Sequence, residues 1–273
     1  MTNQKILLAE TQMAPKDSYR SIYIAPHLDD VVLSCGGQIY EETHRGYTVL
    51  VVTVMAGDPP EKLSGYARQL HRRWELPFDA TAARRQEDID ACTLLGADTA
   101  HWHIPDCIYR FDPTSGEPLY NSDEALFGPV HPADYGLVDE IAIQVAALPP
   151  ADRIVIPLTV GHHVDHQLTR QAAEQSLTQQ FEYFEDFPYI QTQGSLDFLR
   201  PGQWESINFP LTSVALAIKI DAILTYRSQL STFFVDRADL ERQVMTYAAS
   251  VGGERTWKRV EARSGPSKIG PGH

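Results

Sequence analysis

Residues 47–54 constrain the fold more than any other segment, because this run (YTVLVVTV) is apolar at nearly every position rather than at alternate positions. A strand with a continuous apolar pattern is covered on both faces, as in the centre of a parallel sheet. Other apolar runs of strand length alternate with longer segments of helical spacing, which indicates βα units. We therefore predict an α/β protein with a Rossmann-like three-layer fold, in which helices flank a mostly parallel sheet.

The remaining elements follow from the same two periodicities. We expect strands at 21–25, 47–54, 99–103, 152–157 and 180–184. We expect helices at 30–45, 82–95, 134–147, 166–179, 219–231 and 237–250. The irregular segments 55–81 and 104–133 follow strands whose carboxyl ends should share one edge of the sheet. Ligands bind at that edge in open α/β sheets, so we expect the active site there and the two segments as walls of a substrate cleft.

The length and composition set further limits. The chain has 273 residues, of which 43% are apolar, so it can bury a substantial core. We expect one domain over residues 1–263 and a flexible tail over 264–273, which is rich in glycine and proline. The formal net charge of −13 disfavours a nucleic-acid partner, because phosphates would meet a repulsive field.

Three further absences indicate a cytoplasmic protein. The cysteines (Cys35, Cys92 and Cys107) form no disulfide framework and no Cys-x-x-Cys pair. The first 20 residues lack the apolar stretch of a signal peptide. Since no window approaches the roughly 20 apolar residues of a membrane span, we expect no membrane segment.

Two clusters of polar side chains indicate a metal site. His27-Leu28-Asp29-Asp30 comes directly after the first predicted strand. His27 and Asp30 are three residues apart and fall on one side of an opening helical turn, whereas Asp29 points elsewhere. The second cluster, Gly161-His162-His163-Val164-Asp165-His166, follows the predicted strand at 152–157.

The two clusters together predict a hydrolytic metal centre. His27, Asp30 and His166 provide two nitrogens and one oxygen and leave a coordination position for water, which is the composition of a catalytic zinc site. Asp29 is then placed to take a proton from that water. Iron, cobalt or manganese would suit the same ligands.

Simpler explanations exist for each aspartate. Asp29 and Asp30 could cap the helix that follows, and Asp165 could cap the helix near residue 166. Helix caps do not require imidazole, however, so the histidines favour a metal. The sequence has neither a phosphate-binding glycine motif after the first strand nor a Gly-x-Ser-x-Gly elbow, which favours water as the nucleophile.

The motifs resemble those of the LmbE-like or PIG-L zinc-dependent de-N-acetylases. That family has His-Pro-Asp-Asp-Glu after its first strand and His-x-Asp-His after a later one, and this chain has His27-Leu28-Asp29-Asp30-Val31 and His163-Val164-Asp165-His166. The resemblance extends over residues 20–230. Its further parts are Arg84-x-x-Glu87 leading to Leu95-Gly96, Pro105-Asp106, and Lys219-x-x-Ala222-x-x-x-Tyr226-x-Ser228-Gln229.

The resemblance implies a role for each matching residue. His27, Asp30 and His166 would hold one Zn²⁺ per chain, and Asp29 would be the general base. His163 would stabilise the oxyanion or protonate the leaving amine, while Arg84 and Asp106 would contact the substrate. His162 is expected to be packed or solvated. Arg84 could instead pair with Glu87 or Asp88 on its own helix.

The chain departs from the family pattern at three positions. Leu28 replaces proline, Val31 replaces a glutamate that can orient a ligand, and Tyr226 replaces a histidine of the C-terminal element. None of these changes removes a proposed ligand or the base.

The function implied is removal of an N-acetyl group from an N-acetylglucosamine-type sugar or small glycoside. The alternatives are an amidase that acts on a thiol conjugate or acylated natural product, and a binding module that has lost catalysis. Trp102, Tyr109, Tyr120 and Phe127 could line a sugar-stacking wall, although aromatic side chains near a sheet edge more often belong to the core. The segment Glu185-Asp186-Phe187-Pro188-Tyr189, which follows another strand end, could complete the cleft, and its acidic pair could favour a product amine.

Overall fold

Seven strands form one sheet in the order β3-β2-β1-β4-β5-β7-β6 in the computed structural model, which describes residues 16–74, 80–176 and 179–260. The strands are β1 (Tyr19–Ala25), β2 (Val49–Thr53), β3 (Asp98–His101), β4 (Ala151–Pro157), β5 (Glu182–Phe184), β6 (Trp204–Phe209) and β7 (Glu254–Arg259). The first five are parallel to one another, and β7 runs antiparallel between β5 and β6.

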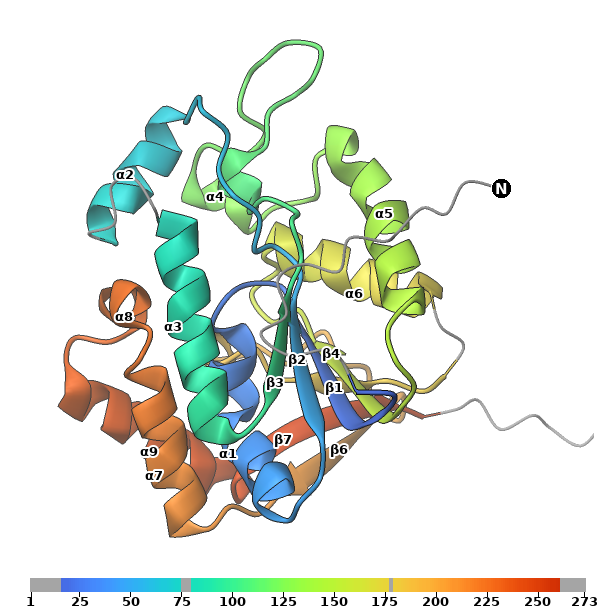
Figure 1. The fold of residues 1–273 in the computed structure, drawn as a ribbon, viewed down its shortest axis with the longest axis vertical. Helices are drawn as coiled ribbons and strands as arrows, with labels where there is room; N and C mark the ends of the chain where they lie inside the picture. Colours follow the sequence, from blue (N-terminus) through green and yellow to red (C-terminus); the bar gives the residue numbers. More distant parts are fainter. Residues whose placement is uncertain (1–15, 75–79, 177–178, 261–273) are drawn as a thin grey trace, which may run out of the picture.

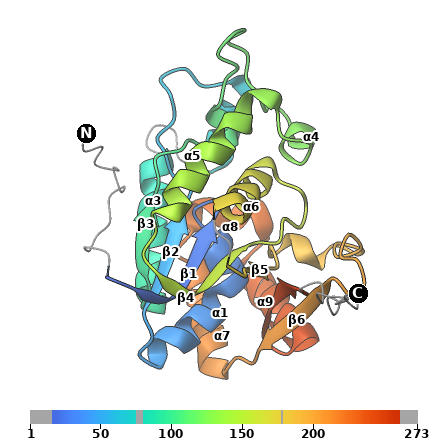
Figure 2. The same ribbon diagram turned by 90° about the vertical axis from the view of Figure 1, so that its right-hand side faces the viewer.

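Helices cover both faces of the sheet (Figures 1 and 2). They are α1 (Asp30–His44), α2 (Gly65–Arg73), α3 (Ala80–Leu95), α4 (Asp123–Leu126), α5 (Tyr135–Ala146), α6 (Val164–Ser176), α7 (Ser213–Ile223), α8 (Arg227–Phe233) and α9 (Arg237–Val251). Helices α1, α3 and α7 pack together on one face, and α5 packs on α6 on the other. The predicted three-layer α/β class is confirmed.

The core lies along the central strands. All five residues of β2 are buried, and in β1 only Arg20 is exposed. Tyr23 of β1 is in register with Val51 of β2 on one side and Val155 of β4 on the other. Continuous apolar runs therefore mark the strands that are covered on both faces, as expected from the sequence.

The five predicted strands and most predicted helices are present with small shifts of their ends. The helix expected over 219–231 is wrong as a single element, because α7 ends at Ile223 and α8 begins at Arg227. Between them, Tyr226 has a ψ of 58°, which is not helical. The predicted tail over 264–273 lies outside the described residues.

Two strands were missed because they are polar. The sequence of β6 is WESINF, with half of its residues exposed at the edge of the sheet, and that of β7 is ERTWKR. Neither contains an apolar run that would mark a strand.

Within the described ranges, no helix is long and apolar enough to cross a membrane.

Candidate metal centre and active site

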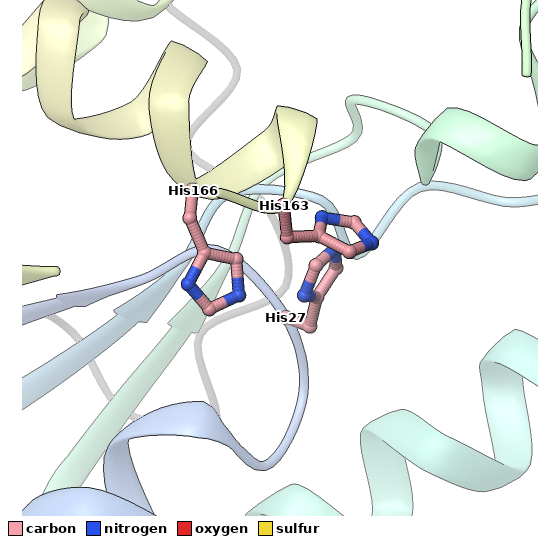
Figure 3. A group of neighbouring side chains, drawn as sticks. All are labelled: His27, His163 and His166. Carbon is pink, nitrogen blue, oxygen red and sulfur yellow. The ribbon is translucent and has the colours of Figure 1, made fainter. Parts of the chain in front are cut away.

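The two predicted clusters meet at the carboxyl ends of β1 and β4, which are neighbours in the sheet. His27 lies in the loop after β1, Asp30 begins α1, and His166 lies in the first turn of α6. Figure 3 shows the rings of His163 and His166 extending from α6 and the residue before it toward the loop that carries His27. The chain continues from β1 to β2 and from β4 to β5, and β2 and β5 lie on opposite sides of the β1–β4 pair. The loops after β1 and β4 therefore diverge and leave a crevice for a ligand.

Three donor atoms converge in this crevice. Asp30 Oδ2 lies 3.1 Å from His27 Nδ1 and 3.2 Å from His166 Nε2. Asp30 and His166 are buried, and His27 is nearly so. The structure therefore brings together the three residues that the sequence proposed as ligands, in the nitrogen and oxygen composition that a divalent transition metal prefers.

Both imidazoles are held from behind by carboxylates. His27 Nε2 lies 3.0 Å from Asp165 Oδ2, and His166 Nδ1 lies 2.6 Å from Asp186 Oδ1. Such pairs fix the ring and its tautomer, so that the other nitrogen of each ring is directed toward Asp30. The sequence did not assign these roles to Asp165 and Asp186. Their positions next to a ligand and after a strand end are the signals that could have suggested them.

The charges of the crevice also favour a cation. Burial lowers the pKa of His166, but Asp30 and the hydrogen bond with Asp186 outweigh it and raise that pKa to about 9. The pKa of His27 is likewise raised well above its usual range, because Asp30 and Asp165 outweigh burial. The carboxylates thus stabilise positive charge on the two rings. They would stabilise a divalent cation between the rings for the same reason. The residues present fit a metal.

Asp29 adjoins these donors and lines the same cavity as His27 and Asp30. Its side chain makes no capping hydrogen bond to α1, so the helix-cap explanation does not hold for this residue. Its φ of 151° is a strained value for a residue with a side chain. Burial, followed by the negative charge of Asp30, raises the pKa of Asp29 to about 7.

The ring of His163 contacts the rings of His27 and Phe127. It meets the His27 ring edge to face, with centroids 4.7 Å apart. The backbone N–H of Asp165 donates to His163 Nδ1 at 3.3 Å, which leaves Nε2 to carry the proton of a neutral ring. Burial, followed by the charge of His27, holds the pKa of His163 well below its usual range. His162, by contrast, is exposed.

Arg84 and Asp106 complete the set of predicted site residues. Arg84, on α3, places its guanidinium 4.0 Å from Asp29 Oδ2 and 3.9 Å from Asp106 Oδ2, and it stacks over the Trp74 ring. The alternative pairing within α3 is wrong, because Glu87 accepts hydrogen bonds from Ser228 instead. Asp88 is bonded to His101 and Tyr226.

A cavity of about 290 Å³ opens above these groups. Six of the seven predicted residues line it, and His166 lies beneath. Its walls come from the two irregular segments, as expected, and from α8 and the loop after β5. The wall residues are Tyr66, Leu70, Arg73, Trp74, Ile108, Asp123, Leu126, Phe127, Tyr189, Gln229, Thr232 and Phe233.

The aromatic wall differs from the predicted one. Of the four candidates, only Phe127 lines the cavity, whereas Trp102, Tyr109 and Tyr120 are buried in the core. The Tyr189 ring lies between Phe127 and Phe233, with centroid distances of 5.7 and 6.1 Å. Tyr66 and Trp74 line the cavity from α2 and its C-terminal cap.

Of the segment 185–189 expected to complete the cleft, Tyr189 lines the cavity, whereas Glu185 does not. It is buried and accepts hydrogen bonds from Tyr247, Arg255 and Trp257. Its role is therefore to join β5 to β7 and α9, away from the cavity.

The family model of GlcNAc-PI de-N-acetylase (PIG-L) matches residues 22–177, which include both clusters of the crevice. The chain belongs to the PIG-L family. The resemblance noted in the motifs is thereby confirmed.

Two curated PIG-L relatives carry the same name. The 2'-N-acetylparomamine deacetylase of Niallia circulans is 30% identical over 242 residues, which is 82% of this chain and 86% of the relative. The protein of that name from Streptomyces fradiae is 26% identical over 259 residues, which is 90% of this chain and 84% of the relative.

Solved structures of the family match over nearly their whole length. A zinc-inhibited form of teicoplanin deacetylase Orf2 is 29% identical with a TM-score of 0.78, over 90% of this chain and 99% of that one. The A40926 pseudoaglycone deacetylase Dbv21 is 28% identical with a TM-score of 0.68, over 88% of this chain and 96% of that one.

The three residues that depart from the PIG-L motifs are all buried in the interior. Leu28 and Val31 are both buried in the apolar interior. The hydroxyl of Tyr226 donates to Asp88 Oδ1 at 2.6 Å, and the other oxygen of Asp88 lies 2.8 Å from His101 Nε2. Tyr226 therefore satisfies a buried carboxylate and does not contact the donors of the crevice.

Proposed function

We propose that this chain is a zinc-dependent N-deacetylase of an N-acetylglucosamine-type sugar or small glycoside. The observation that carries the proposal is the convergence of His27, Asp30 and His166 beside a separate carboxylate, Asp29, at the base of a cavity. The names of the relatives, which are deacetylases of 2'-N-acetylparomamine, of teicoplanin and of the A40926 pseudoaglycone, support the substrate class.

His27, Asp30 and His166 would hold the metal, and Zn²⁺ is the ion we propose. A divalent cation at this position supplies a Lewis acid for the amide carbonyl and for the attacking water. The carboxylates of Asp165 and Asp186 keep the two rings oriented toward it. The remaining chemistry belongs to side chains that are not ligands.

Asp29 is the proposed general base. It accepts a proton from the water whose oxygen attacks the acetyl carbon. A pKa near 7, raised by burial, makes this carboxylate a stronger base than an ordinary aspartate. Its strained backbone fits a residue that is held in place for chemistry.

His163 is proposed to stabilise the developing oxyanion. With Nδ1 accepting the Asp165 backbone N–H, the Nε2–H of a neutral imidazole is free to donate. The C–N bond of the amide then breaks and releases acetate and the sugar amine. Transfer of the proton to the leaving amine, which the family resemblance also assigned to His163, needs a ring that has first taken up a proton.

Arg84 and Asp106 are proposed to bind the polar groups of the substrate. Their polar atoms remain 3.9 Å apart, beyond hydrogen-bonding distance, so both keep capacity for sugar hydroxyls. The rings of Phe127, Trp74 and Tyr189 offer apolar faces on which a sugar can stack.

The test compares wild-type protein with the His27→Ala/His166→Ala double variant. Metal content is measured by elemental analysis, and acetate release is measured with N-acetylglucosamine, 2'-N-acetylparomamine and an N-acetylglucosaminyl glycopeptide. We expect about one zinc per chain and acetate release from at least one substrate in the wild type only.

Two other outcomes would contradict the proposal. Zinc binding without acetate release from any of these substrates would favour the amidase alternative, which is then tested with acylated thiol conjugates. Absence of metal after reconstitution with zinc would favour the binding module.

A further inference from the structure

Asp165 is the most enclosed carboxylate of the site. Its side chain is fully buried, and it accepts hydrogen bonds from three sides. The backbone N–H of Cys107 donates at 3.0 Å, Arg110 donates at 2.5 Å, and His27 Nε2 lies 3.0 Å away. Only the last of these partners is a proposed ligand, so the other two set the position of the carboxylate.

Arg110 is the charged partner, and it is itself only 7% exposed. Its Nε lies 2.9 Å from Asp134 Oδ2, and Nη1 donates to the carbonyl of Pro105 at 3.2 Å. Its guanidinium also lies over the Tyr120 ring. The planar fork therefore bridges two buried carboxylates, which a single ammonium group cannot do with the same geometry.

The contacts that run from Arg110 through Asp165 end at His27, whose Nδ1 is the nitrogen proposed to bind the metal. Because His27 Nε2 is engaged by Asp165, the Nδ1 of the same ring faces Asp30. A carboxylate that lost its arginine would be a buried charge free to change its rotamer, and it would no longer define the plane of the imidazole. The position of His27 thus depends on a residue in the segment expected to form only a cleft wall.

We infer that Arg110 is a positioning residue of the metal centre, which fixes the orientation and tautomer of His27 through Asp165. The inference rests on the proposed metal site. It assigns to Arg110 no contact with substrate and no part in proton transfer.

Arg153 provides a matched control. It is also largely buried, bridges two carboxylates at 2.7 Å each (Glu42 and Glu182) and lies over a tyrosine ring, that of Tyr23. It does not line the cavity. Arg153→Met therefore removes the same kind of interaction at a place where no proposed ligand depends on it.

The experiment measures the affinity for Zn²⁺ alone by competition with a chelator, together with the visible spectrum of the Co²⁺-loaded protein. We expect Arg110→Met to bind zinc about 10- to 100-fold more weakly and to alter the cobalt spectrum. Arg153→Met should leave both unchanged, even where it lowers the thermal stability of the metal-free protein. Wild-type affinity in Arg110→Met, or an equal loss in Arg153→Met, would overturn the inference.

Two milder variants cover the case in which Arg110→Met does not fold. Arg110→Lys keeps the charge and Asp134→Asn keeps the guanidinium, and each should weaken zinc binding by a smaller factor. If both bind zinc as the wild type does, the inference is wrong. If the wild type itself binds no zinc through His27, the proposed metal site fails instead, so the two failures are distinct.

Discussion

Asp30 Oδ2 and His166 Nε2 lie 3.2 Å apart, although the two residues belong to helices that follow different strands. Asp29, the neighbour of Asp30 in the chain, instead faces Arg84 at 4.0 Å. Two adjacent aspartates are therefore directed to different partners, one to His166 and one to Arg84. This division can be tested by removing each function separately.

We expect Asp29→Ala to retain about one zinc per chain and to lose about 10²- to 10⁴-fold in kcat, since only the base is removed. His166→Ala should lose both metal and activity, because a ligand is removed. Elemental analysis and acetate release measure the two properties on the same samples. Substantial turnover in Asp29→Ala would mean that another group takes the proton.

The positive φ of Asp29 predicts that the residue at this position affects the free energy of unfolding through the backbone. With a φ of 151°, glycine fits this position better than alanine, so Asp29→Gly should be more stable than Asp29→Ala by about 1 kcal/mol. Urea unfolding of chelator-treated protein measures the difference. The same pair at Ser34, inside α1, is the control, and there alanine should be the more stable residue. Equal stability of the two Asp29 variants would show that the backbone is not strained.

The raised pKa of Asp29 predicts a dependence of stability on pH in metal-free protein. Burial and then Asp30 raise this pKa from 3.8 to about 7, so the folded state favours the protonated carboxyl. The contribution to stability is complete below pH 3.8 and is lost as the pH rises to about 7. Asp29→Asn, which cannot ionise, should therefore become more stable than the wild type over this range, by an amount on the order of a few kcal/mol. Urea unfolding of both proteins with chelator between pH 4 and 8 tests this, and a constant difference would contradict it.

Tyr226, which replaces the histidine of the family pattern, is expected to contribute to stability and not to zinc binding. Tyr226→Phe removes the donor to Asp88 Oδ1 and should destabilise the protein by about 1–3 kcal/mol, with zinc affinity unchanged. Thermal unfolding and chelator competition measure the two effects. The exposed Tyr135 offers a control, since Tyr135→Phe should change neither. A loss of zinc affinity in Tyr226→Phe would place this residue in the support of the metal centre.

The sequence predicted those parts of the site that are local. His27 and Asp30 lie within one turn, and His166 follows a strand that a continuous apolar run identifies, so the topology of an α/β sheet brings them together. The contacts of Arg110 could not be predicted, because they join segments that no motif relates. Trp102 and Trp74 show the same limit, since only the packed structure distinguishes a core aromatic residue from one that faces the cavity.

Elements were missed for a related reason. The strands β6 and β7 are held by backbone pairing at one side of the sheet and carry polar side chains, which leave no apolar pattern. At the interruption between α7 and α8, Tyr226 bonds to Asp88, which is a contact between distant segments. Local periodicity records burial and therefore does not record such contacts.

The order of the strands also separates the residues of the proposed metal centre from much of the cavity wall. The proposed metal ligands, and the carboxylates behind them, come from the ends of β1, β4 and β5, whereas much of the cavity wall comes from the long segments that contain α2 and α4. Tyr66 and Asp123 of those segments line the cavity and pair with each other rather than with a proposed ligand. A library of variants aimed at new acylated sugars would therefore randomise these wall positions and leave Arg110, which lies in the same stretch of chain, untouched.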